Sequence, residues 1–231
     1  MFKQKALSLA IHMTLAGSLL AGTTGVMAYE AGDVIVRAGA ATVDPNDDSS
    51  RLTLNGAGLP NSKAYVDSDT QLGLTLTYML TDHLGLGLLA ATPFKHDIKA
   101  KNLLVPGKID AGSTKHLPPT LTLQYFPMKA ESRFQPYAGV GINYTKFFEE
   151  DVASELEGIV GAGGKLKLDE SWGVAFELGM DYALSDRWVV NAAVWYIDID
   201  TDAKFNFPGA EVKTKVDIDP LVYMVGIGYK F

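Results

Sequence analysis

Histidine and serine side chains could support nucleophilic catalysis in this sequence, but the histidines are few. After the first 28 residues only His83, His96 and His116 remain. A serine–histidine mechanism needs the base within hydrogen-bond reach of its nucleophile, and none of the three shares a predicted strand face with a partnered serine. His96 and His116 flank one predicted loop and could approach each other. We therefore expect polar loop residues, no catalytic residue and no enzyme.

Two acidic segments could offer oxygen ligands to a cation. The first carries Glu149, Glu150, Asp151, Glu155 and Glu157, and the second is Asp198-Ile199-Asp200-Thr201-Asp202. The second lacks the Gly and the final Glu of an EF-hand loop, and solvated charge is the usual role of the first. The chain has no Cys, its His are scattered, and its net charge is −7. We expect no metal, no cofactor and no nucleic-acid partner, since nucleic acid binds a basic surface.

The first residues have the pattern of a cleaved secretory signal peptide. Lys3 and Lys5 give a positive start, residues 6–20 are mostly apolar, and Val26-Met27-Ala28 has the A-x-A form of a cleavage site. Cleavage after residue 28 would leave a domain of residues 29–231. A membrane anchor is the alternative, but the apolar run is short for one. No later run has helix length, so a membrane position would require a closed β-barrel.

Most of the remaining chain alternates in polarity with a period of two. Between residues 72 and 80, Leu or Tyr takes every second position, and Gly, Thr or Met lies between them. A strand places such residues on one face, whereas a helix would scatter them. The same pattern predicts strands at residues 34–41, 72–80, 84–90, 117–125, 138–145, 172–182, 188–196 and 221–231. The sequence therefore predicts an all-β fold, an eight-stranded antiparallel transmembrane β-barrel.

The connections between these strands alternate in length, as they do in outer-membrane barrels. The short ones are Thr81–His83, Pro127–Arg133 and Ser185–Arg187, and we expect them on the periplasmic side with both termini. The long polar ones, expected as external loops, are Asp44–Asp67, Lys99–Thr114, Glu149–Asp169 and Thr201–Lys213. A soluble β-sandwich or lipocalin is the competing fold, but its water-facing surface would carry more charge than the Gly, Ala and Thr seen here. We expect the outer membrane of a Gram-negative bacterium, with lipid and lipopolysaccharide as surroundings.

Four charged residues fall on the small-residue face near the predicted periplasmic end. They are the cations Arg37 and Lys230 and the anions Glu177 and Asp181. That face points into a narrow barrel, where an unpaired buried charge is costly. We expect the two cations to pair with the two anions and to form a polar floor.

Several segments resemble the OmpW family of outer-membrane proteins over the whole mature length. The most specific are Thr70-Gln71-Leu72-Gly73-Leu74-Thr75, Leu88-Leu89-Ala90-Ala91-Thr92-Pro93-Phe94, His116-Leu117-Pro118-Pro119-Thr120, Pro136-Tyr137-Ala138-Gly139-Val140-Gly141-Ile142-Asn143-Tyr144, Ser171-Trp172-Gly173 and Val194-Trp195-Tyr196-Ile197-Asp198-Ile199-Asp200. The resemblance implies an eight-stranded barrel with a narrow hydrophobic channel that passes small apolar molecules. It also implies that Leu89 and Trp195 line this channel.

The alternation places the same two residues on the inward face. Leu89 follows two inward glycines, and Trp195 follows Asn191 and Ala193. Ile197 and Phe147 lie further toward the external end on inward positions. These four side chains predict an apolar pocket above the polar floor, and the simpler alternative is that they only fill the barrel.

A narrow hydrophobic channel is therefore the predicted function. An apolar solute would enter between the external loops, bind in the pocket and leave sideways into the bilayer, because the charged floor opposes straight passage. Pro93, Pro118 and Pro119 lack a ladder N–H and could weaken the wall, or they could simply end strands. The alternative function is a docking barrel whose loops bind a phage, a bacteriocin or a host surface.

Overall fold

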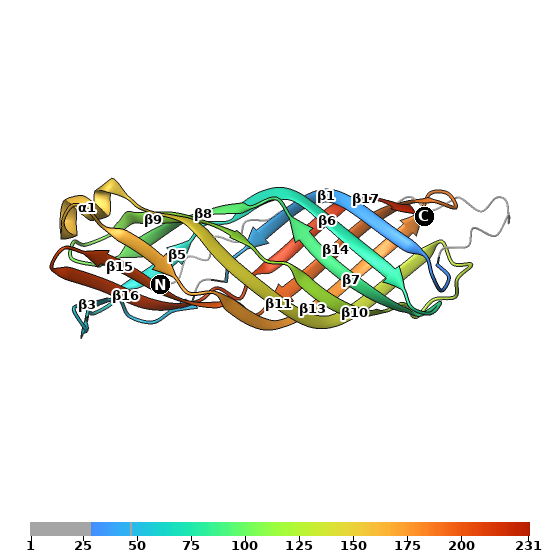
Figure 1. Cartoon of the computed structure of the whole chain (residues 1–231), viewed down its shortest axis with the longest axis horizontal. Coiled ribbons are helices and arrows are strands. Elements are labelled where there is room, and N and C mark those ends of the chain that lie inside the picture. The colour runs from blue at the N-terminus through green and yellow to red at the C-terminus, as the bar shows by residue number, and fades with distance from the viewer. Residues whose placement is uncertain (1–28, 47) are drawn as a thin grey trace, which may run out of the picture.

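A closed barrel of eight antiparallel strands forms the body of the molecule. The computed structural model describes residues 29–46 and 48–231, so the predicted signal peptide lies outside the described residues. The barrel strands are β1 (Val34–Asp44), β6 (Asp69–Met79), β7 (Leu84–Ala91), β10 (Thr120–Tyr125), β11 (Phe134–Val152), β13 (Ser171–Ala183), β14 (Trp188–Ile197) and β17 (Leu221–Lys230). They pair in the order β10-β7-β6-β1-β17-β14-β13-β11, and the β10–β11 pairing closes the circle (Figure 1). The predicted fold is confirmed.

The outer face of this barrel is apolar, as the period of two predicted. Leu72, Leu74 and Leu76 on β6 are exposed, while Thr75 and Thr77 between them are buried. Aromatic side chains on the outer face contact each other, with ring centroids 4.7 Å apart for Tyr144 and Trp172 and 5.0 Å apart for Trp188 and Tyr229. An apolar wall with such aromatic pairs is what a lipid-facing barrel surface requires.

Several glycines allow the barrel to be narrow, and Gly141 shows why. A Cβ added at Gly141 would collide with the backbone carbonyl oxygen of Leu121 on β10. Any larger residue would therefore push β10 and β11 apart. The glycines of the inward face are thus a packing requirement of a small barrel.

The connections predicted to be long are long, but about half of their residues form further strands, which build an extension of the barrel. One side of the extension is β5 (Lys63–Val66), β8 (Phe94–Lys101) and β9 (Lys108–Leu117), which continue from the upper part of β11. The other is a sheet of β12 (Lys165–Leu168), β15 (Asp200–Phe207), β16 (Ala210–Asp217), β3 (Thr53–Leu54) and β4 (Ala57–Gly58), with β2 (Asp48–Ser49) paired to β16. The helix α1 (Ser154–Val160) lies at the far end (Figure 1).

The strands of the extension were not predicted because their alternation is the reverse of that in the barrel, with apolar residues inside and charged residues outside. In β8, Phe94, His96, Ile98 and Ala100 are buried, while the alternate positions are Lys or Asp. The period of two continues, but the outer residues are charged because that surface meets water instead of lipid. Apolar outer residues therefore mark only the part of each strand that faces lipid.

The short turns and the C-terminus lie at the end of the barrel opposite the extension (Figure 1). The first described residues are there too, since Gly32 N–H donates to the Met79 carbonyl and Phe231 N–H donates to the Val34 carbonyl. In the described part of the chain, no helix has the length and apolar character needed to cross a membrane.

Candidate functional site: the barrel lumen

A buried ion pair lies in the lower lumen, which is the half of the barrel interior nearer the short turns. Arg37 on β1 donates to Asp181 on β13 from Nε at 3.0 Å and from Nη2 at 2.5 Å, and each side chain is 1% exposed. Asp181 also accepts from the Tyr29 hydroxyl at 2.5 Å and from Asn191 Nδ2 at 2.8 Å. Four donor atoms therefore converge on one carboxylate, which is how a buried charge is compensated.

The hydrogen-bond network continues from this pair across the lumen. Arg37 Nη1 donates to Thr77 Oγ1 at 2.8 Å, and that hydroxyl donates to Gln124 Oε1 at 3.0 Å. Gln124 Nε2 donates to both oxygens of Glu177 at 2.9 and 3.0 Å, and Thr122 Oγ1 donates at 2.7 Å. The sequence does not reveal the parts played by Tyr29, Thr77 and Thr122, because neutral hydroxyls on an inward face look like ordinary small-barrel filling.

The predicted pairing of two cations with two anions holds for Arg37 and Asp181 alone. Glu177 is held by neutral donors, including the Trp195 side chain. Lys230 lies at the last inward position of β17, where its Nζ is 3.3 Å from Asp33 Oδ2. In the pairing of β1 with β17, Lys230 lies opposite Ile35, whereas Arg37 lies opposite Gly228, two residues away. Lys230 therefore contacts Asp33 at the rim of the barrel.

Apolar side chains occupy the lumen above this network. Leu89, Phe147, Trp195 and Ile197 are all buried and belong to one continuous apolar cluster. Trp195 and Leu89 lie lowest and border a small gap together with Glu177, too narrow for a water molecule. The four predicted pocket residues are therefore in one region, but they do not line a single cavity.

A mainly apolar cavity lies higher, inside the extension. Its volume is about 30 Å³. Phe147 lines it, and its other lining residues include Leu52, Ile98, Leu168, Phe205 and Val216. Leu52, Leu168 and Phe205 were missed because they belong to segments predicted as polar loops, and Ile98 and Val216 lie just outside such segments and outside the predicted strands.

A third space, of about 10 Å³, lies against the wall, where the strand ladder is interrupted. It is lined by Ala41, Leu89, Ala90, Ala91, Phe94, Pro118 and Val222. The β7–β10 pairing ends at Leu89 and Thr120, and the β8–β9 pairing resumes at Phe94 and His116. Residues 90–93 and 117–119 are therefore not paired with each other, although both segments bond to their other neighbouring strands, and three prolines without an N–H lie among them.

Two histidines meet inside the extension, as their positions in the sequence allowed. The Nε2 atoms of His96 and His116 are 3.0 Å apart, and both side chains line the apolar cavity of the extension. Burial lowers the pKa of His96, and burial together with His96 lowers the pKa of His116 to about 3. His83 is elsewhere, in a short turn, with Nδ1 2.8 Å from the Phe126 carbonyl oxygen. The described part of the chain places none of the three beside a serine hydroxyl.

The acidic segment predicted as solvated loop charge mostly binds the protein's own backbone. Glu155 accepts from the Asp110 N–H at 2.7 Å, and Glu157 accepts from two glycine N–H groups at 2.9 and 3.0 Å. Glu150 accepts from the Leu168 N–H at 2.8 Å, and Glu149 pairs with Lys115 at 2.5 Å. These carboxylates therefore fix the extension in shape.

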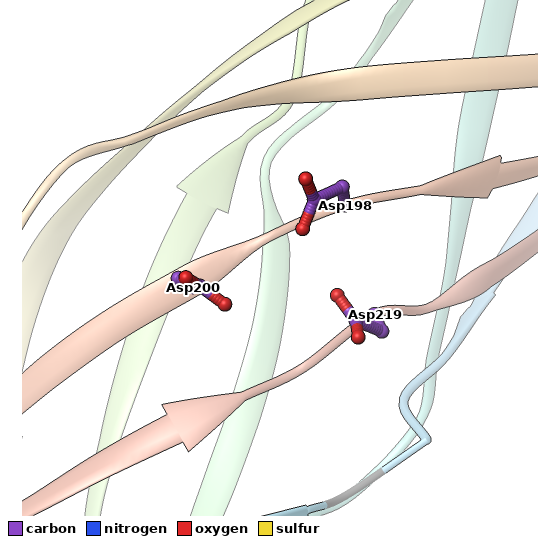
Figure 2. A group of neighbouring side chains, drawn as sticks. All are labelled: Asp198, Asp200 and Asp219. Carbon is purple, nitrogen blue, oxygen red and sulfur yellow. The ribbon is translucent and has the colours of Figure 1, made fainter.

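Three other carboxylates gather on the outside of the wall. Oxygens of Asp198, Asp200 and Asp219 all lie within 4.8 Å of one another, at the junction between the barrel and the extension (Figure 2). Lys215 Nζ is 3.0 Å from Asp200, and the Ile199 N–H donates to Asp219 at 3.3 Å. The protein's own groups thus already balance part of this charge.

The barrel with its apolar lumen matches known proteins over nearly its full length. The profile of the OmpW family matches residues 30–231. The chain belongs to the OmpW family. It is 48% identical over 207 residues to outer membrane protein W of Vibrio cholerae, covering 89% of this chain and 92% of the relative. It is 41% identical to outer membrane protein W of Escherichia coli over all 231 residues, which is the full length of both chains.

Solved structures agree with this assignment. The crystal structure of the outer membrane protein OprG from Pseudomonas aeruginosa is 51% identical, with a TM-score of 0.84 over 89% of this chain and 99% of that one. The structure of outer membrane protein AlkL in lipid bilayers has a TM-score of 0.64 at 23% identity, covering 94% of this chain and 97% of that one, which supports the fold alone. This OmpW-family chain is an outer-membrane protein that sits in the lipid bilayer of a Gram-negative bacterium.

Proposed function

We propose that this OmpW-family barrel takes small apolar molecules from the outside of the cell and releases them sideways into the outer membrane. The observation that carries the proposal is the division of the lumen into an apolar upper part and a closed polar floor. The upper part holds the apolar cavity of the extension and the wall space beside Leu89. The floor holds the Arg37–Asp181 pair and its network.

The proposed path has three stages. The solute first enters the extension and gains roughly 25 cal/mol for each Å² of apolar area removed from water. It then moves toward Leu89, below which the charged network stops an apolar molecule. The wall segments 90–93 and 117–119, which are not paired with each other, give it a sideways exit, since few backbone hydrogen bonds must be broken between them. Pro93, Pro118 and Pro119, which could weaken the wall, lie in these two segments.

A relative supports the chemical class of the solute. The chain is 27% identical over 185 residues to a Pseudomonas aeruginosa protein described as dibenzothiophene metabolism operon protein PahQ, covering 80% of this chain and 82% of the relative. Dibenzothiophene is an apolar aromatic compound. We also propose that the barrel works without catalysis. Both termini are proposed to lie in the periplasm, because the short turns and the C-terminus share one end of the barrel (Figure 1).

Replacing Trp195 tests this function. Trp195 borders the gap beside Leu89, where the solute is proposed to stop. Trp195→Ala should therefore remove roughly 60 Å² of apolar contact with the solute, worth roughly 1.5 kcal/mol, so an apolar dye should bind about tenfold more weakly. Trp188→Ala is the matched control, because Trp188 lies on the outer face against Tyr229. Dye binding is measured by fluorescence titration of the barrel in lipid nanodiscs. Unchanged binding in Trp195→Ala would contradict the proposal.

A docking role remains the alternative, and transport measurements distinguish the two. The channel proposal expects apolar probe to reach the membrane of proteoliposomes faster than that of protein-free liposomes. No acceleration, together with a phage, bacteriocin or host ligand bound to the extension, would favour docking instead.

A further inference from the structure

His96 and His116 form a buried polar group within an otherwise apolar cavity. His96 is 4% exposed and His116 is 2% exposed. The ring of His116 lies between two phenylalanines, with its centroid 5.5 Å from that of Phe94 and 5.8 Å from that of Phe147. Nδ1 of His116 has no hydrogen-bond partner among the described residues. A buried polar atom without a partner is costly, so it needs an explanation.

The hydrogen bonds determine which nitrogens carry protons. His96 Nδ1 is 2.5 Å from the Asp67 carbonyl oxygen, which can only accept, so this nitrogen carries a proton. In a neutral imidazole the other nitrogen is then an acceptor, so His96 Nε2 accepts from His116 Nε2–H at 3.0 Å. His116 Nδ1 is consequently a bare acceptor. The lowered pKa values of both rings agree with a neutral pair at pH 7.

We propose that His116 Nδ1 is a recognition point for apolar molecules that carry one hydrogen-bond donor, such as phenols and alcohols. The hydroxyl would donate to Nδ1, while the apolar body would lie in the cavity against Phe147 and its aliphatic neighbours. This inference rests on the proposed function, since both use the cavity of the extension, and it narrows the class of solute.

The surroundings of the pair favour a neutral donor over an ion. The charged groups nearest to His96 are Asp67, Asp69 and Asp97, all of them anionic, and Lys99 borders the cavity. The Lys99 ammonium already pairs with Asp67. An anionic ligand would meet these carboxylates, and a cation would lose its hydration in an apolar space. A hydroxyl satisfies Nδ1 without either cost.

Two fluorinated probes of nearly the same shape test the proposal. The first is 4-fluorophenol, neutral at pH 7, and the second is 4-fluorotoluene, which replaces the hydroxyl with a methyl group. Binding to the full barrel in lipid nanodiscs is followed by fluorine NMR, with empty nanodiscs as the baseline. Dividing the wild-type affinity by the variant affinity for each probe cancels the partition of the probe into lipid.

Three variants separate recognition from packing. In His116→Phe the phenol should bind about five- to tenfold more weakly, as for one hydrogen bond to a buried acceptor, while the toluene is unaffected. His116→Gln keeps a donor for His96 and an acceptor for the ligand, so it should retain the preference. Phe147→Leu, the matched packing control, should weaken both probes alike.

Nitrogen-15 NMR of the wild-type protein tests the proton positions without any variant. We expect the Nδ1–H form of His96, the Nε2–H form of His116, and a shift of the His116 Nδ1 signal with 4-fluorophenol alone. An Nδ1–H form of His116 would overturn the inference, and so would equal effects of His116→Phe on the two probes. If 4-fluorotoluene binds no better than to empty nanodiscs, the apolar-channel function itself fails.

Discussion

Replacing Asp181 with asparagine tests whether the floor of the lumen depends on its buried charge pair. The substitution keeps the shape of the side chain but removes the negative charge. It also places an amide where the carboxylate accepts from Arg37, Tyr29 and Asn191. The Arg37 guanidinium then remains buried at 1% exposure without a counter-ion.

The structure sets the expected size of this effect. Removing one partner of a buried ion pair costs about 3–5 kcal/mol, because the other charge stays uncompensated. Asp169→Asn provides the comparison, since Asp169 pairs with Lys204 at 2.6 Å on the surface, where the side chains are 41% and 31% exposed. Exposed pairs contribute about 0–1 kcal/mol. The two asparagine substitutions should therefore differ by at least about 2 kcal/mol.

Urea unfolding of the barrel in phospholipid vesicles, followed by tryptophan fluorescence, measures both free energies. Adding Arg37→Met to Asp181→Asn should recover part of the loss, because the unpaired guanidinium is then gone. Glu177→Gln should cost less than Asp181→Asn, since neutral donors hold Glu177. Equal destabilisation by Asp181→Asn and Asp169→Asn would refute the reasoning.

Two further predictions concern pH and the wall. The pKa of His116 is about 3 in the folded chain against 6.5 for a free ring, so the unfolded chain binds more protons between these values and stability falls as the pH drops below 6.5; the loss should reach about 2 kcal/mol at pH 5. His116→Phe should remove this part of the pH dependence of urea unfolding, and an unchanged pH profile would contradict the assignment. Pro93→Ala with Pro118→Ala returns two ladder donors at the wall gap, so transfer of an apolar probe from barrel to vesicle membrane should slow, whereas Pro127→Ala in a short turn should leave it unchanged. Equal transfer rates in all three proteins would argue against sideways exit.

The sequence was sufficient for the barrel because lipid imposes a strict rule on each spanning strand. Outward positions such as Leu72, Leu74 and Leu76 must be apolar, whereas the alternate inward positions carry small, polar or charged side chains. This rule repeats every two residues, so one chain carries it without any knowledge of neighbours. The inward placement of Arg37, Glu177, Asp181 and Trp195 follows from the same parity.

Contacts between distant strands were decided only by the tertiary structure. The odd or even position of a residue along a strand gives the face on which it lies, but the pairing register between strands gives its partner. This register brings Arg37 to Asp181, 144 positions away, and Lys230 to Asp33. The extension was missed because water, unlike lipid, does not require an apolar outer face. The histidine pair shows both limits. The sequence allowed His96 and His116 to meet, but only the folded strands bury them and leave His116 Nδ1 without a partner in residues 29–46 and 48–231.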